Sequence, residues 1–119
     1  MIKQIKSFEI KKFIESNPKT VLLDVRTEDE WNTVGKPDTK ALGIKSYFVT
    51  ISQDPSFLEN VKNKIKIDNT VLVSCAAGGR SLIAANLLEQ EGYTAINVSD
   101  GFSGNGQDPG WKNSGLPTK

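Results

Sequence analysis

The segment from Cys75 to Ser81 contains the residues best suited to chemistry in this chain of 119 residues. It reads Cys-Ala-Ala-Gly-Gly-Arg-Ser and directly follows the apolar run 71–73. The four residues after the cysteine are small and allow a tight loop with inward-pointing backbone N–H groups: Ala76, Ala77, Gly78 and Gly79. A thiol there is stabilised as a thiolate by the N–H groups, by the following helix start and by Arg80. We therefore predict that Cys75 is a nucleophile, with Ser81 supporting the loop or capping the helix.

The composition restricts how this thiolate is activated. The chain has one cysteine and no histidine, which excludes an internal disulfide, a Cys-x-x-Cys redox pair, a thiolate zinc cluster and a Cys-His dyad. A helix dipole contributes about 0.3–1 kcal/mol, and roughly 2 kcal/mol when partly buried. Since a pKa unit corresponds to about 1.36 kcal/mol, the dipole alone lowers a thiol pKa by about one unit. We expect no metal and no cofactor.

A structural role is the alternative for Cys75. Free cysteines often behave as small hydrophobes at the end of a core strand. The Gly-Gly-Arg-Ser sequence that follows, and the helix start beyond it, favour the reactive interpretation.

The remaining pattern predicts the elements that position this loop. Short apolar runs predict buried strands at 20–25, 70–74 and 95–98, with a weaker candidate at 41–44. Apolar spacing predicts helices at about 8–16, 55–65 and 80–90, and a short helix through Trp31. Alternating strands and helices predict one α/β domain over residues 1–119, with a mainly parallel sheet and helices on both faces. Cys75 then lies at the carboxyl end of a strand, where such sheets bind ligands.

Turn and cap residues predict where the helices begin and end. Ser7 is predicted to cap the first helix, Thr27 to form a capping box with Glu30, and Asp54-Pro55 to open the third helix. Gly92 is expected to end the helix after the Cys75 loop. The apolar side of that helix is expected to contain Leu82, Ile83, Leu87 and Leu88.

Charged residues near the end of strand 20–25 have a structural interpretation. Asp24 and Arg26 are expected to act as scaffolding, with Arg26 paired to Glu30 or to another carboxylate. The net charge is +1, from 15 Lys and Arg against 14 Asp and Glu. This balance favours neither nucleic acid nor an anionic membrane, and no apolar run is long enough to span a bilayer. We expect a cytoplasmic protein.

Four segments in order resemble the rhodanese family. Cys75-x-x-Gly78-x-Arg80-Ser81 is similar to its active-site loop, and Leu23-Asp24-Val25-Arg26 followed by Glu28, Glu30 and Trp31 to its Asp-Val-Arg segment. The later matches are Gly92-Tyr93 with Asn97-Val98, and Gly101-Phe102 with Trp111 and Gly115-Leu116-Pro117. The resemblance implies a three-layer domain with a central sheet of about five strands.

The resemblance also implies sulfur transfer in two steps. Cys75 would take the outer sulfur of thiosulfate or another donor as a persulfide, and Arg80 would carry part of the anionic charge. Cyanide, a cellular thiol or a protein would then accept the sulfur. An apparent insertion at 103–110 is expected to be a surface loop.

Three functions therefore stay open. The first is a sulfurtransferase, and the second is a non-catalytic persulfide carrier or regulatory module. The third is a phosphatase or arsenate reductase on the same fold, and comparison with the related phosphatases argues against it. Related phosphatases have five residues between Cys and Arg and a preceding histidine, whereas this chain has four residues and Ser74. With one cysteine, no internal thiol resolves an arsenate intermediate.

Overall fold

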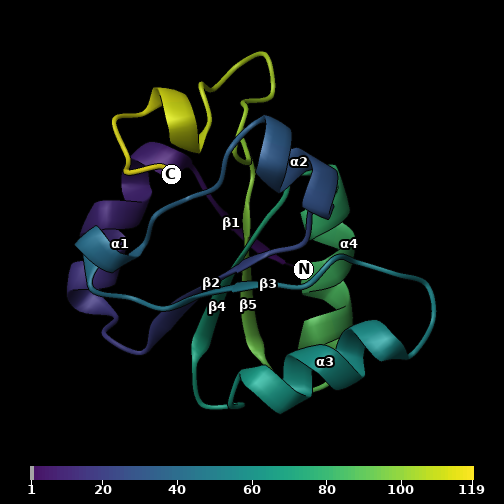
Figure 1. Ribbon diagram of the computed structural model, residues 1–119. Helices are drawn as coiled ribbons and strands as arrows, with labels where there is room; N and C mark the ends of the chain where they lie inside the picture. The colour runs from purple at the N-terminus through teal and green to yellow at the C-terminus, as the bar shows by residue number, and fades with distance from the viewer. Residues whose placement is uncertain (1) are drawn as a thin grey trace.

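One parallel sheet organises the computed structural model, which describes residues 2–119 (Figure 1). Its strands follow the order β1-β5-β4-β2-β3, and all neighbouring pairs are parallel. The strands are β1 (Lys3–Ile5), β2 (Thr20–Asp24), β3 (Ser46–Phe48), β4 (Thr70–Ser74) and β5 (Thr94–Val98). The expected α/β class with about five strands is confirmed.

Helices cover both faces of the sheet. Figure 1 shows α1 on one side, with the C-terminal segment near it, and α3 and α4 on the other. The α-helices are α1 (Ile10–Ser16), α2 (Glu28–Thr33), α3 (Ser56–Lys64) and α4 (Gly79–Gln90). Three short 3₁₀ helices complete the set: η1 (Ser7–Glu9), η2 (Lys40–Leu42) and η3 (Trp111–Asn113).

Strand alternation divides the core into two clusters. Leu23 and Val73 pack in the cluster that includes residues of α3 and α4. Leu22 and Leu72, one residue earlier in each strand, pack with Ile10 of α1. Because successive side chains point to opposite faces, a continuous apolar run fills both clusters. Cys75 follows β4 on the α3 and α4 side.

Two strand predictions need correction. The candidate strand at 41–44 is wrong, because residues 40–42 form η2 and the strand begins later, at Ser46. Gly43 explains the difference, since its positive φ of 76° breaks an extended backbone. The sequence also missed β1, an edge strand of three residues that pairs with β5. Lys3-Gln4-Ile5 is too short to display a periodic pattern.

Ser7 does not cap a helix as predicted. Its backbone N–H and its hydroxyl both donate to Asp100 Oδ1, at 3.0 and 2.8 Å. Both residues are buried, so this contact ties the start of η1 to the turn after β5. A helix cap is satisfied within its own turn, whereas this partner lies far along the chain.

The third helix begins one residue later than Asp54-Pro55 suggested. Pro55 is the N-cap of α3, and Asp54 accepts hydrogen bonds from the backbone and hydroxyl of Ser56. Two other terminus predictions are confirmed. Thr27 and Glu30 form the capping box of α2, and Gly92 has a φ of 95° after α4.

The predicted buried side of α4 is confirmed in part. Leu88 is buried, and Leu82 and Leu87 are partly buried against the core, whereas Ile83 is exposed. Ser81, Ala84, Ala85 and Leu88 are buried in this helix, at the i, i+3, i+4, i+7 spacing of one helix face. Small alanines let this face lie close to the sheet, which turns Ile83 outward with 60% of its surface exposed. Among residues 2–119, no helix is both long and apolar enough to cross a membrane.

Candidate active site

The carboxyl ends of β2 and β4 bring two loops together. Asp24 lies opposite Ser74 in the parallel register, and the Val25 N–H donates to the Ser74 carbonyl at 2.9 Å. Cys75 begins one loop, and the segment from Val25 to Thr27 forms the other. The site therefore lies at the edge of the sheet that the sequence predicted.

The thiol of Cys75 lies within a ring of donors. Its Sγ accepts a hydrogen bond from the Gly78 N–H at 3.1 Å and lies 3.3 Å from the Ser81 hydroxyl. Burial raises the pKa of Cys75, but hydrogen bonds from the Ser81 side chain and backbone, and from the Ala77 and Gly78 backbones, lower it. The net pKa lies below the ordinary value, so the site favours the thiolate without an imidazole.

Cys75 is buried although its pKa is lowered. The residue is 1% exposed and belongs to the core cluster under α3 and α4. The structural alternative is thus correct about its burial, yet a purely structural cysteine needs no donors aimed at its sulfur. The side chain can meet a reaction partner only at a protruding atom, such as the terminal sulfur of a donor.

The sequence predicted Ser81 but missed the residue behind it. The Ser81 hydroxyl lies 2.5 Å from Asn97 Oδ1, and Asn97 Nδ2 donates to the Gly78 carbonyl at 3.1 Å. Asn97 also donates to Gln4 Oε1 at 3.0 Å. One hydroxyl proton cannot serve the sulfur and Asn97 together. It binds Asn97 when the sulfur is neutral and turns to the sulfur when that atom is charged.

A signal for Asn97 was present in the sequence. It is a single amide in the otherwise apolar run Ala95-Ile96-Asn97-Val98, at a position that faces α4. A buried polar side chain requires a partner, so this residue marked a buried polar contact. Its partner could not be deduced, because Ser81 is 16 residues away.

Arg80 forms an ion pair with Glu30 across the site. Its guanidinium donates to Glu30, with Nη1–Oε1 at 2.7 Å and Nη2–Oε2 at 2.9 Å. The hydrogen bond from Arg80 is the main reason that the pKa of Glu30 falls to about 2. Within residues 2–119, the hydrogen bonds to the sulfur come from other residues. The pKa of Arg80 is raised mainly by Glu30 and, to a smaller extent, by the charge of Cys75, so the predicted stabilisation of the thiolate by Arg80 stays a prediction beside this ion pair.

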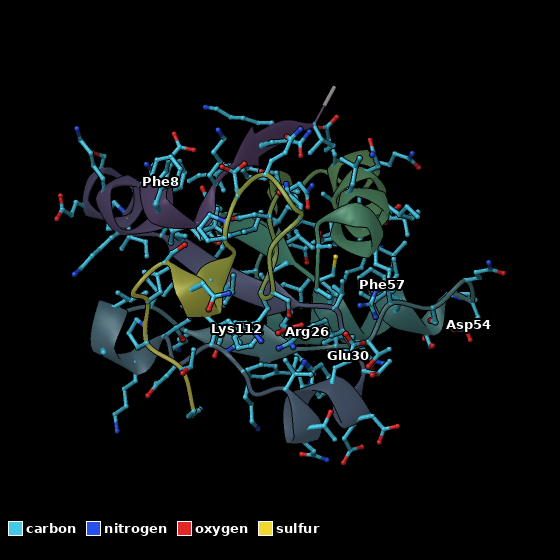
Figure 2. All side chains as sticks on the ribbon, turned by 90° about the horizontal axis from the view of Figure 1, so that it is seen from above. Phe8, Arg26, Glu30, Asp54, Phe57 and Lys112 are labelled. Atoms are coloured by element: carbon cyan, nitrogen blue, oxygen red, sulfur yellow. The ribbon has the colours of Figure 1, made fainter. Side chains whose placement is uncertain are left out.

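Arg26 forms the scaffolding ion pair with a carboxylate that the sequence predicted. It is fully buried and pairs with Asp24, with Nη2–Oδ2 at 2.8 Å and Nε within 3.1 Å of both oxygens. It also donates to the Gly35 carbonyl at 3.0 Å and lies over the Phe102 ring. The prediction of Glu30 or another carboxylate is confirmed in its second form, with Asp24 as the partner. Arg26 and Glu30 both belong to the segment after β2 (Figure 2).

The segment after β5 braces the Cys75 loop. Phe102 N–H donates to the Cys75 carbonyl at 2.8 Å, and Ser103 N–H to the Ala76 carbonyl at 2.9 Å. A Cβ on Gly78 would overlap the Ser99 backbone, and one on Gly101 would overlap the Ala76 backbone. Both glycines therefore serve close backbone approach as well as positive φ. The predicted loop at 103–110 is confirmed as irregular structure.

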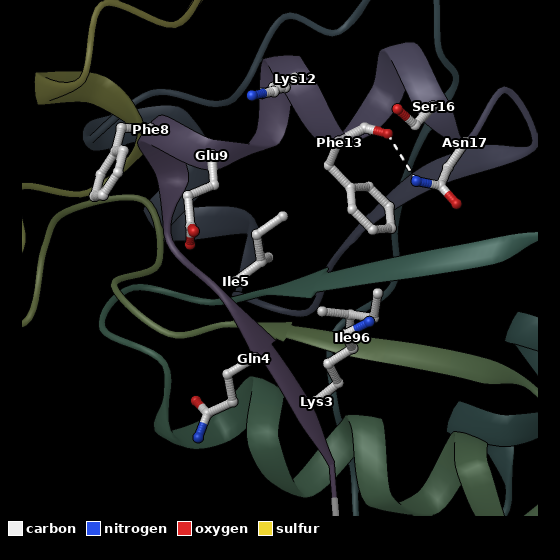
Figure 3. A pocket seen from close by; sticks show the side chains of 10 residues that line it. All are labelled: Lys3, Gln4, Ile5, Phe8, Glu9, Lys12, Phe13, Ser16, Asn17 and Ile96. Carbon is white, nitrogen blue, oxygen red and sulfur yellow. Dashed lines mark hydrogen bonds between the residues drawn. The ribbon is translucent and has the colours of Figure 1, made fainter.

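A separate hollow lies between β1 and α1 (Figure 3). It encloses about 510 Å³, and in the picture Ile5, Phe13 and Ile96 point into it while Gln4 points away toward α4. None of the residues 75–81 lines it. Within residues 2–119, no cluster of three or more His, Cys, Asp or Glu side chains is arranged to hold a metal.

Comparison with known proteins finds similarity to rhodanese-like proteins along nearly the whole chain. The family described as STR4 middle domain matches residues 5–119. RP600 of Rickettsia prowazekii is 42% identical over 106 residues, covering 85% of this chain and 84% of that protein. Thiosulfate sulfurtransferase 16 of Arabidopsis thaliana is 34% identical over 70 residues, covering 58% of this chain and 53% of that protein. Rhodanese-like domain-containing protein 4 of the same plant is 34% identical over 101 residues, covering 81% and 21%.

Solved structures share the fold. Rv0390 from M. tuberculosis superposes with a TM-score of 0.84 at 32% identity, covering 98% of this chain and 96% of that one. A rhodanese-like domain protein from Staphylococcus aureus gives a TM-score of 0.70 at 26% identity, covering 99% of both chains. Both proteins thus share the overall fold on which the Cys75 loop is placed.

Proposed function

Because this chain belongs to the rhodanese-like family, we propose that it is a sulfurtransferase that carries a sulfane sulfur on Cys75. The observation that supports this most directly is the Gly78 N–H at 3.1 Å from Sγ, on a loop with four residues between Cys75 and Arg80. Such a loop is sized for one extra sulfur atom, and its N–H groups suit the anionic end of a persulfide.

The first step loads the sulfur. The Cys75 thiolate attacks the outer sulfur of thiosulfate, a new S–S bond forms, and the bond to the inner sulfur breaks. The electron pair leaves with sulfite, so no proton and no external oxidant are needed. The negative charge moves from Sγ to the terminal sulfur, close to the backbone N–H groups of the loop. Ser81 then donates to Asn97, because Sγ is no longer charged.

The second step unloads it. A nucleophile such as cyanide or a thiolate attacks the terminal sulfur, and Sγ leaves as the thiolate that began the cycle. Thiosulfate, cyanide and cellular thiols are the proposed small-molecule partners, and a protein thiol is an alternative acceptor. A cytoplasmic location is part of the same proposal.

Intact-mass measurement tests the loading step. Protein incubated with thiosulfate and then freed of excess should gain the mass of one sulfur atom and lose it when cyanide is added. Cys75→Ser is the matched control, since it removes the sulfur and little volume, and it should gain nothing. If the wild-type mass does not change with thiosulfate or any persulfide donor, the proposal is wrong.

A persulfide carrier is the second candidate, and two observations favour it. Cys75 is 1% exposed, and Arg80 is held by Glu30, which limits access and charge at the site. Loading followed by very slow release to small acceptors would identify a carrier. Hydrolysis of an aryl phosphate that requires Cys75 would instead support the phosphatase.

A further inference from the structure

A groove adjoins the catalytic loop on the outer side of α4. It encloses about 670 Å³ between α4 and the segment 51–58, a volume within the range of small-molecule sites. Arg80 lines it and is also the residue that ends the catalytic loop. Its apolar lining comes from both sides of the groove: Ile51, Phe57, Leu58, Ile83 and Leu87.

The spacing on α4 connects the groove to the nucleophile. Arg80, Ile83 and Leu87 stand at i, i+3 and i+7, so they form one stripe that begins at the first turn of the helix. Ile83 is 60% exposed and does not belong to the buried face of α4. A large apolar side chain, one helical turn from the Arg80 that ends the Cys75 loop, thus remains in water.

Charge limits what can occupy the groove. Glu30 pairs with both ends of the Arg80 guanidinium, which cancels the nearest cation. Asp54 stands at the groove wall, and the Ser56 hydroxyl and backbone keep the pKa of its carboxyl below the ordinary value. Figure 2 shows Asp54 at the outer end of this segment and Phe57 nearer the sheet. A compact dianion finds no uncompensated cation among the residues that line the groove, and it gains nothing from the apolar walls.

We propose that this groove binds the apolar body of a small organic sulfur donor, whose terminal sulfur reaches Cys75. This rests on the proposed sulfurtransferase function and adds the substrate class. The groove contacts the uncharged apolar part, while the anionic sulfur end meets the N–H groups of the loop. Thiosulfate is then a poor mimic of the donor, because it has no apolar body.

Two thiosulfonates that share one reacting group test the proposal. In methanethiosulfonate and benzenethiosulfonate, the Cys75 thiolate attacks the terminal sulfur, an S–S bond forms, and the sulfinate leaves with the electron pair of the broken bond. The readout is kcat/KM for persulfide formation, divided by each donor's rate with a small free thiol. This correction removes the difference in intrinsic reactivity.

The benzene donor should be favoured by roughly tenfold or more, since a small apolar increment in a pocket gives about 10–200-fold discrimination. Ile83→Ser should remove most of that preference. Ile67→Ser is the matched control, because Ile67 is also exposed, at 54%, and precedes β4 at the opposite end of the sheet. It should leave the preference unchanged.

The outcomes separate the two proposals. Equal corrected rates for both donors, or a preference that survives Ile83→Ser, would overturn the groove assignment while leaving persulfide chemistry intact. Equal rates are also expected if the groove binds a protein and not a small donor. If neither donor adds sulfur to Cys75, the proposed function fails and this assignment fails with it.

Discussion

The guanidinium of Arg80 and the carboxylate of Glu30 meet in two parallel hydrogen bonds of 2.7 and 2.9 Å. The pair joins the first turn of α4 to the first turn of α2, across the mouth of the Cys75 loop. Bidentate geometry fixes both side chains and cancels their charges. The thiolate therefore depends on hydrogen bonds and the helix start more than on a free cation.

Glu30→Gln should make the site more electropositive. The variant removes one negative charge and keeps an oxygen for Arg80, so the guanidinium charge is no longer cancelled. We expect the pKa of Cys75 to fall further and thiosulfate loading to accelerate several-fold at low salt, by about 1 kcal/mol at most. An alkylation-rate titration and the salt dependence of loading measure this. Glu15→Gln is the control, because it makes the same change at an exposed carboxylate on α1. An identical titration for wild type and Glu30→Gln would contradict the prediction.

Acid should weaken the fold partly through Glu30. Its pKa falls from 4.5 to about 2 in the folded protein, so its stabilising effect is complete above pH 4.5 and is lost as the pH falls toward 2. Because the pair is partly exposed, we expect about 1 kcal/mol. Urea midpoints from pH 6 to about pH 2 should fall less steeply in Glu30→Gln than in wild type. Equal slopes would mean that the pair does not contribute.

Ser81→Ala should raise the pKa of Cys75. Its hydroxyl donates to the charged sulfur, and a hydrogen bond to a charged group contributes about 1.5–3 kcal/mol, or roughly one to two pKa units. The pH dependence of iodoacetamide alkylation should move upward accordingly. Ser74→Ala is the control, because Ser74 is also buried but its hydroxyl lies near a carbonyl, not Sγ. If both variants move the profile equally, the contact is not specific.

Two adjacent glycines should respond very differently to alanine. Gly78 has a φ of 101°, and its new Cβ would overlap the Ser99 backbone, whereas a Cβ on Gly79 meets nothing within 4 Å. We expect Gly78→Ala to cost about 2–4 kcal/mol and to abolish loading. Gly79→Ala should be neutral or stabilising by up to about 1 kcal/mol, as Gly is a poor helix residue. Thermal unfolding compares them, and tolerance of Gly78→Ala would show that the loop can rearrange.

The buried pair of Asp24 and Arg26 should matter far more than a surface pair. Arg26→Ala leaves a fully buried carboxylate without its cation, which costs about 3–5 kcal/mol. Lys19→Ala breaks the exposed pair with Asp68 and should cost less than about 1 kcal/mol. Urea unfolding of both variants measures the contrast. Similar losses would indicate that water enters the site in Arg26→Ala.

Local sequence patterns predicted the Cys75 loop, but they could not predict contacts between residues that are distant in the sequence. Cys75, the two glycines and the helix start are contiguous, so their geometry follows from neighbours along the chain. The partner of Arg80 lies 50 residues away. Arg26 had Glu30 or another carboxylate as its expected partner, and the structure pairs it with Asp24 while Glu30 pairs with Arg80. Sequence periodicity describes one element at a time, so it cannot rank equivalent partners on different elements.

The same reason explains the errors in the fold. Leu82, Ile83, Leu87 and Leu88 are the large apolar residues of α4, so hydrophobicity alone selects them. Leu88 is buried, and Leu82 and Leu87 are partly buried. The buried face also contains Ala84 and Ala85, because small side chains allow close approach to the sheet, and Ile83 is left exposed.

The bracing of the Cys75 loop by Phe102 and Ser103 has a consequence for synthesis. Every side chain that touches the sulfur has been translated once Ser81 is added, yet the carbonyls of Cys75 and Ala76 gain their partners only about twenty residues later. Asn97 and the edge pairing of β5 with β1 also arrive late. On the ribosome the cysteine therefore emerges long before its N–H ring is fixed. The N–H ring around the sulfur is therefore fixed only after the segment through Ser103 has been added, together with the closing of the sheet.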